Sequence, residues 1–267
     1  MATEKQIITA YNGTQITFYP TSHRYKLENE KTYLLSPSSI VGIMDKSQAL
    51  LTWNDNLIKG RVASIDEVEY NKNDVITLVD SLLNVRKEKL EVAGETGDIV
   101  HDYAEQTAYC KAYNQPLPEI DLDTLSEEQV RGITSFIKFN GENNPKYIEA
   151  ERFVFSQNNG EKYIGKLDTM FEINGITYLG DFKTSKNVYF SHKVQLALYD
   201  LALIEEYNFK NQPLPYTNLA IVHLDKNTGE YTIHYISEEE RKDLHEAAIS
   251  ALKLKALDKK YNKWEAK

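Results

Sequence analysis

The sequence predicts an α/β protein whose core is a central mixed β-sheet flanked by helices. A helical segment at about residues 126–140 is followed by three segments with the character of strands, then by a helix and two more strands. That order is typical of an α/β sandwich with a mixed sheet. The dipeptide Asn174-Gly175 separates two of the strand segments. It favours a two-residue hairpin turn, because both central positions of a type I′ turn have a positive φ.

An amino-terminal extension is expected before this core. We place residues 1–92 in the extension, packed on the core, and residues 93–267 in the core with a C-terminal helix. Alternating apolar residues around turn dipeptides predict strands, and a serine followed by proline is a typical helix start. The expected elements are strands at residues 7–19 and 24–35, a short helix at about 40–44, and helices at about 74–92 and 98–113, interrupted at Glu95-Thr96-Gly97-Asp98.

The second half of the chain carries clearer boundaries. Ser126 and Ser237 each begin a Ser-x-x-Gln or Ser-x-x-Glu pattern, in which the two side chains cap each other's backbone amides at a helix start. The expected elements are a helix from 126 to about 140, strands at 147–156, 163–173 and 176–184, a helix at about 188–207, strands at 217–224 and 230–236, and a last helix to the end of the chain.

The composition is that of an ordinary globular chain, with 267 residues, 41% hydrophobic and 27% charged. No apolar run approaches the roughly 18 residues that span a bilayer, and the amino terminus lacks a basic segment followed by an apolar one. We therefore expect an intracellular, cytoplasmic protein without a membrane partner. A single cysteine, Cys110, can form no internal disulfide and cannot alone hold an iron–sulfur cluster.

The net charge of −9 lowers the expectation of nucleic-acid binding, because phosphate contacts require Lys and Arg. Basic groups confined to one groove can still bind a polyanion, and a metal-dependent nuclease concentrates carboxylates at its active site. The lysines near the carboxyl terminus are either a DNA-backbone contact or a solvated helix face, and the second interpretation is favoured.

The predicted hairpin brings two aspartates together. If Asn174-Gly175 is the loop, counting outward along the two strands places Asp168 opposite Asp181, with Cβ atoms roughly 4.5–5.5 Å apart. Facing carboxylates repel, so a divalent cation between them is the reasonable partner, and oxygen ligands favour Mg²⁺ or Mn²⁺. Lys183 lies two residues beyond Asp181 and therefore on the same face, whereas Phe182 points into the core and offers its carbonyl. The alternative is a surface hairpin with scattered charges.

Two helices supply further candidates. His101 and Glu105 are spaced i, i+4 and share a helix face, where they either bind metal or are a satisfied core histidine and an exposed glutamate. Gln195 and Tyr199 have the same spacing on the helix after the hairpin and can hydrogen-bond a phosphate or a base, or brace the catalytic residues. Glu151 is either another acidic group near the metal or an exposed strand end, and the residue alone favours the second.

Together these residues resemble the PD-(D/E)XK nuclease superfamily in its RecB-like branch, in particular its phage-type and mitochondrial genome maintenance exonucleases. The match covers roughly residues 93–236 and agrees in order and spacing. Its motifs are Gly97-Asp98-Ile99-Val100-His101 with Glu105, Gly165-Lys166-Leu167-Asp168, Gly180-Asp181-Phe182-Lys183-Thr184-Ser185, and Gln195 with Tyr199; the amino-terminal His23-Arg24-Tyr25, Ser36-Pro37-Ser38-Ser39-Ile40 and Leu50-Leu51-Thr52-Trp53 resemble phage members.

The resemblance implies a restriction-endonuclease-like core and one or two Mg²⁺ or Mn²⁺ ions held by His101, Asp168, Asp181 and the Phe182 carbonyl. It implies that Lys183 aids the attacking water. It also implies catalytic roles for Glu105, Gln195 and Tyr199 and DNA contacts from Thr184, Ser185, Gln195 and Tyr199.

The expected function is metal-dependent DNA exonuclease activity on single- or double-stranded DNA with ends, in phage or bacterial recombination, replication or repair. A single-strand annealing or recombination protein is the expected partner. The alternatives are a catalytically weak DNA- or partner-binding protein on a nuclease fold, and an endonuclease or RNA-acting nuclease.

Overall fold

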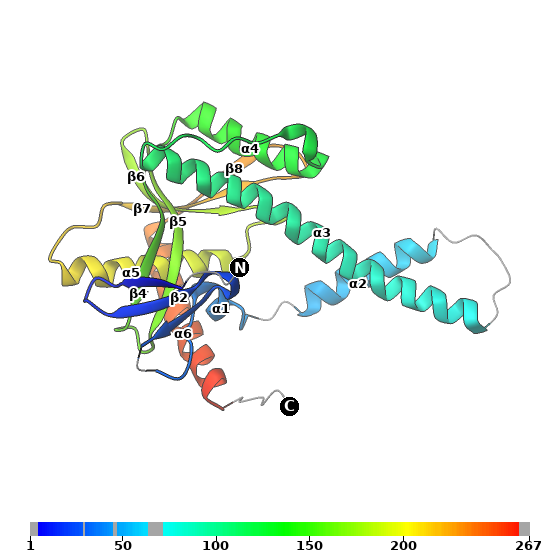
Figure 1. Cartoon of the computed structure of the whole chain (residues 1–267), viewed down its shortest axis with the longest axis horizontal. Helices are drawn as coiled ribbons and strands as arrows, with labels where there is room; N and C mark the ends of the chain where they lie inside the picture. Colours follow the sequence, from blue (N-terminus) through cyan, green and yellow to red (C-terminus); the bar gives the residue numbers. More distant parts are fainter. Residues whose placement is uncertain (1–4, 29, 45–46, 64–71, 262–267) are drawn as a thin grey trace. The chain divides into compact units, whose positions relative to one another are not determined.

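The computed structural model describes residues 5–28, 30–44, 47–63 and 72–261 (Figure 1). By its internal contacts the chain divides into two compact units, Met1–Met44 with Val100–Lys267, and Asp45–Ile99. Residues 1–44 therefore belong to the unit that contains the large sheet. These units do not coincide with the sequence-based boundary between residues 92 and 93, which stays a prediction.

The larger unit contains a five-stranded sheet in the order β4-β5-β6-β7-β8 among the described residues. All neighbours are antiparallel except β6 and β7, which run parallel and are joined through a helix. The mixed α/β sheet flanked by helices is confirmed. The strands are β4 (Lys146–Ser156), β5 (Tyr163–Ile173), β6 (Ile176–Lys183), β7 (Asn218–Leu224) and β8 (Tyr231–Ile236).

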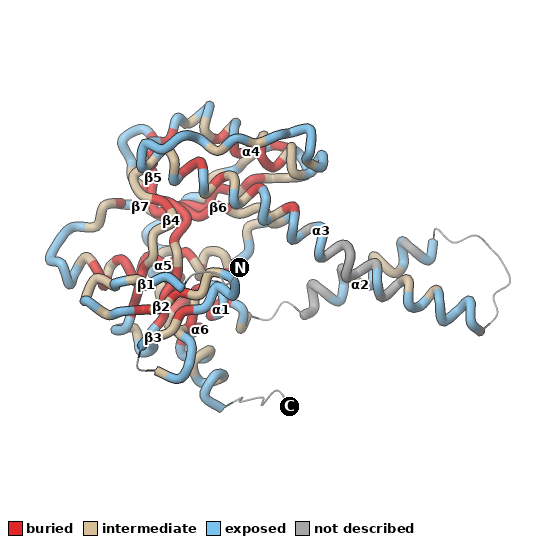
Figure 2. Tube along the Cα trace, in the orientation of Figure 1, coloured by how far each residue is buried: buried red, intermediate tan, exposed pale blue. Residues whose placement is uncertain are grey.

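Helices cover both faces of this sheet (Figure 1). One face packs against α5 (Phe190–Phe209) and α6 (Glu238–Tyr261), and the other against α4 (Glu127–Asn143) and the residues of α3 from Val100 onward. Strand alternation explains the two cores: Leu219 and Ile221 point to the α5 side, and Ala220 and Val222 to the α4 side. Figure 2 shows the buried residues concentrated between these layers.

A separate antiparallel sheet is formed by β1 (Gln6–Thr9), β2 (Gln15–Tyr19) and β3 (Arg24–Leu27). Its apolar face packs on Phe155 and Ile164 of the β4–β5 hairpin. The short helix α1 (Pro37–Val41) follows, and Ser36 caps it as the sequence predicts. Leu35 pairs with Tyr163, so the chain leading into α1 is anchored to the first residue of β5.

Two helix predictions need correction. The expected interruption at residues 95–98 is wrong, because α3 runs without a break over Lys72–Ala112. Each glycine in a helix costs only about 1 kcal/mol, so Gly94 and Gly97 do not end it. The helix α2 (Ser47–Ala63) was not expected at all. The expected strand over 24–35 is also too long: β3 ends at Leu27, and Tyr33 makes an isolated bridge to Lys26.

No helix in the described part of the chain is both long enough and apolar enough to cross a membrane.

Candidate active site

The β5–β6 hairpin has the predicted register. Ile173 pairs with Ile176, and the pairing continues to Thr169 and Gly180. Both loop residues have a positive φ, 52° at Asn174 and 80° at Gly175, as the turn prediction requires. The local sequence therefore positions the residues at the open end of the hairpin.

Asp168 and Asp181 lie one position beyond the last pair of this ladder. They do not form a backbone pair themselves, because the Asp168 carboxylate takes the place of a main-chain acceptor. Its Oδ2 atom accepts a hydrogen bond from the Phe182 amide at 2.8 Å. Phe182 points into the opposite core, as predicted from alternation.

Asp181 is fully buried, and neither of its carboxylate oxygens accepts a hydrogen bond of good geometry within the described structure. Lys183 forms an ion pair with it, with Nζ 2.6 Å from Oδ2, so the other oxygen, Oδ1, is the one left without a partner. Burial raises the pKa of Asp181 to about 7, although the charge of Lys183 opposes that change. A buried carboxylate with an unfilled acceptor site is costly unless a cation completes it.

His101 links the helix to the hairpin. Its Nε2 lies 3.3 Å from Asp168 Oδ2, and its Nδ1 lies 3.3 Å from Glu105 Oε1. Burial lowers the pKa of His101, but the charges and hydrogen bonds of Asp168 and Glu105 outweigh burial and raise the pKa well above its usual value. The same contact, together with Lys183, holds the pKa of the buried Asp168 below its usual range.

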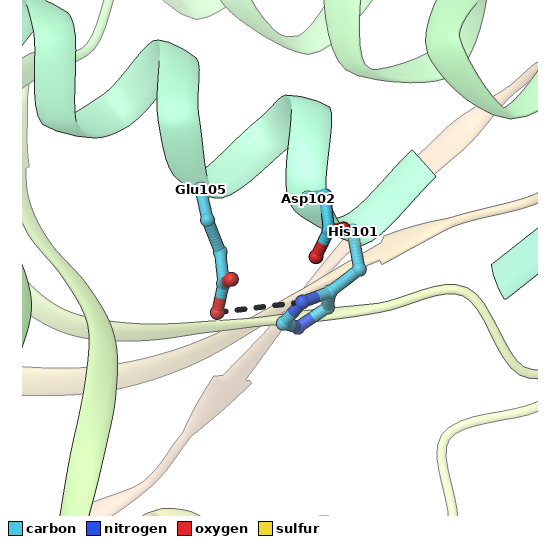
Figure 3. A group of neighbouring side chains, drawn as sticks. All are labelled: His101, Asp102 and Glu105. Atoms are coloured by element: carbon cyan, nitrogen blue, oxygen red, sulfur yellow. Dashed lines mark ion pairs between the residues drawn. The ribbon is translucent and has the colours of Figure 1, made fainter. Parts of the chain in front are cut away.

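Figure 3 shows a second arrangement of ligand-type groups on α3. His101, Asp102 and Glu105 each offer one possible ligand atom, and these three atoms lie within 4.8 Å of one another. Among the described residues, this is the group of metal-binding residue types that meets that distance limit. Asp102 was missed in the sequence, although three metal-binding residue types within five positions of one helix are a usable signal. Asp168 and Asp181 are not in this group.

A cavity of about 280 Å³ opens over these residues. It brings together His101, Glu105, Asp168, Lys183, Gln195 and Tyr199 from the predicted set, and adds His23, Tyr25, Ser36, Pro37, Ser38, Asp102, Gly165 and Lys166. The fully buried Asp181 and Phe182 are not among the described residues that line it, and neither are Thr184 and Ser185. The Ser185 hydroxyl donates to the carbonyl of Asn187, and its own carbonyl contacts His223, so their predicted DNA contacts find no geometric support here.

Gln195 and Tyr199 enter the cavity from α5, and the Gln195 amide lies 3.3 Å from the Tyr199 hydroxyl. Burial, together with the charges of Asp168 and Asp181, raises the pKa of Tyr199 well above its usual value. The close packing beside Tyr199 leaves no room for a side chain at Gly165. A Cβ at this position would lie 2.7 Å from Pro37 Cδ and 2.8 Å from Tyr199 Cε1.

Glu151 is not an exposed strand end. It lies within β4 with a left-handed φ of 56°, and its side chain is 20% exposed. One carboxylate oxygen pairs with Lys166, and the other is buried without a hydrogen-bond partner in the described structure. Burial, and then the nearby charge of Glu105, raises the pKa of Glu151 to about 7. Its partner Lys166 lines the cavity, whereas Glu151 is not among the described residues that line it.

No protein-family model matches the chain, and no curated protein matches it. Among solved structures, the crystal structure of SSO0001 is similar at 15% sequence identity and a TM-score of 0.32, over 79% of this chain and 87% of that one. A likeness at this level carries no argument about function.

Proposed function

We propose that the protein is a metal-dependent DNA exonuclease with a PD-(D/E)XK core. The observation that carries the proposal is the Asp181 carboxylate. It is fully buried, has no hydrogen-bond donor at Oδ1 among the described residues, and lies beside Asp168 and Lys183 at the open end of one hairpin. Ordinary buried carboxylates have their acceptor sites filled. An unfilled one next to a histidine and a second aspartate fits a divalent cation.

His101 through Nε2, Asp168, Asp181 and the Phe182 carbonyl would hold the ion, and oxygen donors with one imidazole suit Mg²⁺ or Mn²⁺. When bound, the ion lowers the pKa of a water and polarises a phosphoryl oxygen. Glu105 favours this choice of ligands because it faces Nδ1, the other ring nitrogen, and so fixes the orientation and tautomer of His101. Glu105 is therefore a positioning residue in this proposal.

The remaining side chains of the cavity would neutralise the charge of the substrate and orient it. Lys183 offsets negative charge that develops on the phosphate, because it is held within the site by Asp181. Gln195 offers an amide and Tyr199 a hydroxyl toward the same cavity, where they contact the phosphate or a base. Exonuclease action, and a setting in phage or bacterial recombination with an annealing partner, follow from the family resemblance alone.

The alternative cluster on α3 makes a different prediction about the ligands. If His101, Asp102 and Glu105 held the ion, His101 would bind through Nδ1, and Asp181 would be dispensable for ion binding. Asp102→Asn and Asp181→Asn separate the two arrangements. Under the proposal, Asp181→Asn abolishes the Mn²⁺-dependent increase in thermal stability, and Asp102→Asn keeps it.

The activity test uses end-labelled single- and double-stranded DNA and covalently closed circles, each with Mg²⁺, Mn²⁺ or EDTA. We expect linear DNA to be degraded with either metal, circles to persist, and EDTA to stop the reaction. Lys183→Ala should abolish hydrolysis, and Lys242→Ala, which removes an exposed lysine of α6, should not. Full activity of Lys183→Ala would refute the site, and cleavage of circles would assign an endonuclease. Binding of DNA without hydrolysis would support the catalytically weak alternative.

A further inference from the structure

A second cavity, of about 340 Å³, adjoins the candidate active site. The two cavities share His23, Tyr25 and Ser36 as walls. The second cavity continues from these residues between the β3–α1 segment and the carboxyl-terminal turns of α6. We call it the basic groove; its remaining lining residues are Arg24, Tyr33, Leu34, Leu35, Ser39, Lys255 and Lys259.

The charge of the basic groove is opposite to that of the chain. Arg24, Lys255 and Lys259 line it, and no aspartate or glutamate is among the described residues that line it. The whole chain has 40 acidic residues against 31 Lys and Arg. Such local segregation of cations in an acidic protein favours an anionic ligand, because field lines concentrate in a concave wall of one sign.

The cations of the basic groove are held in place. Lys255 Nζ lies 3.1 Å from a carboxylate oxygen of Asp258, and the Lys259 ammonium group donates to the carbonyl oxygen of Tyr33. Arg24 lies over the Tyr33 ring, 5.0 Å from its centroid. These contacts fix the positions of three charges, one from β3 and two from α6, which are far apart in the sequence.

An aromatic ring accompanies these charges. Tyr33 is 40% exposed, and its ring is bordered by Tyr19 at 5.9 Å between centroids. Cations that follow a backbone, combined with an exposed aromatic ring, are typical of surfaces that bind single-stranded nucleic acid, because unstacked bases present their faces to the ring. A duplex keeps its bases stacked and would use only the charges.

We propose that the basic groove binds the phosphate backbone of a single DNA strand whose end lies in the candidate active site. This inference rests on the proposed function, and it adds the strand type and the path of the substrate. The continuity of the two cavities supplies the direction: a strand leaving the carboxylates passes His23 and Ser36 and reaches Arg24, Lys255 and Lys259.

The test compares two double variants of the same helix in the full chain. Lys255→Gln with Lys259→Gln removes two charges from the basic groove. Lys253→Gln with Lys260→Gln removes two charges from exposed positions of α6 that do not line it. The probe is a fluorescent oligothymidylate, either alone or annealed to oligodeoxyadenylate, in EDTA, which stops hydrolysis. Anisotropy is measured over a series of salt concentrations.

We expect the groove variant to bind more weakly and to lower the slope of log K against log salt by about 0.7 for each phosphate that no longer meets a cation, or about 1.4 for two. The control variant should keep the slope of the unmodified protein. The deficit should grow with length over about 4 to 16 nucleotides, because only a longer strand spans both cavities. Equal slopes in both variants, or a deficit confined to duplex DNA, would overturn the proposal.

Failure of the groove and failure of the proposed function give different results. If strand binding depends on Lys255 and Lys259 but the protein hydrolyses no DNA, the proposal for the basic groove stands and the proposed exonuclease activity is refuted. If the groove variant keeps both metal-dependent hydrolysis and strand binding unchanged, the proposed exonuclease activity stands and the proposal for the basic groove is refuted. Thermal stability of both variants, measured in parallel, shows that each is folded.

Discussion

The carboxylate of Asp168 accepts a hydrogen bond from the backbone amide of Phe182, at 2.8 Å. The amide belongs to the neighbouring strand, so a side chain here replaces a main-chain acceptor just where the β5–β6 ladder ends. The hairpin thereby fixes one aspartate through the backbone of its partner strand. It leaves the other, Asp181, buried with an oxygen that no donor from the described part of the chain reaches.

Replacing Asp168 should separate this structural role from its charge. In Asp168→Asn the amide oxygen can still accept from Phe182, whereas Asp168→Ala leaves a buried N–H group without a partner. We expect the alanine variant to be less stable than the asparagine variant by about 1–3 kcal/mol, the usual cost of such a group. Denaturant unfolding of the two variants measures the difference, and equal stability would mean that the hydrogen bond contributes nothing. Both variants should lack hydrolytic activity.

Divalent ions should stabilise the protein through Asp181. At an ion concentration 100 times the dissociation constant, binding to the folded state alone adds about 2.7 kcal/mol. We expect Mn²⁺ to raise the thermal midpoint of the unmodified protein and of Glu239→Gln, which alters an exposed carboxylate, but not that of Asp181→Asn. The same measurement is made with Ca²⁺, a second divalent ion that binds oxygen ligands. An unchanged response of Asp181→Asn would contradict the ligand assignment, independently of any activity assay.

The glycine of the Gly-x-x-Asp motif has a packing role that can be measured. Gly165→Ala forces a Cβ against Pro37 and Tyr199, and overpacking of this kind costs about 1–3 kcal/mol. Gly141→Ala is the control, because a Cβ there meets nothing within 4 Å and the position lies in α4, where alanine is favoured over glycine. We expect the first to destabilise and the second to stabilise in denaturant unfolding. A neutral Gly165→Ala would show that α1 moves away without cost.

The sequence predicted the second half of the fold well because its signals are local. Ser126 and the Asn174-Gly175 turn fix where a helix and a hairpin begin, and the hairpin fixes which residues share a face. The uninterrupted α3 could not be predicted, because Gly94 and Gly97 are weak helix breakers whose effect depends on their surroundings. Glu151 was misjudged for a similar reason. Its left-handed backbone and burial arise from tertiary contacts that no local pattern encodes.

Acid should weaken the contact between α5 and α6 through Asp200. This buried carboxylate accepts from Tyr216 and from two nitrogens of Arg241, each at 2.7 Å, and lies 2.6 Å from His245 Nε2. Burial raises its pKa, but the hydrogen bonds from His245 and Arg241 outweigh burial and leave the pKa below its usual value. Because the folded-state pKa is the lower one, the stabilisation is complete above the unfolded pKa of about 3.9 and is lost as the pH falls further.

Asp200→Asn should therefore cost about 3–5 kcal/mol near neutral pH, since it leaves the Arg241 guanidinium, whose side chain is only 14% exposed, without its carboxylate. Its stability should also vary less with pH below about 4 than that of the unmodified protein. Asp243→Asn, an exposed carboxylate of the same region, is the control. Urea unfolding at a series of pH values tests both statements. Parallel pH profiles for the unmodified protein and Asp200→Asn would refute the pH dependence, and equal stability near neutral pH would refute the cost.

The left-handed backbone of Glu151 gives the last prediction. Asn and Val both remove its carboxylate and its ion pair with Lys166, so the two variants differ mainly in how well they tolerate a φ of 56°. Asparagine adopts this conformation readily, whereas a β-branched residue rarely does, and the difference is about 1–2 kcal/mol. We expect Glu151→Val to be less stable than Glu151→Asn by that amount in denaturant unfolding. A valine variant as stable as the asparagine variant would mean that the strand relaxes, and the carboxylate of the native residue would then be what holds the strained backbone in place.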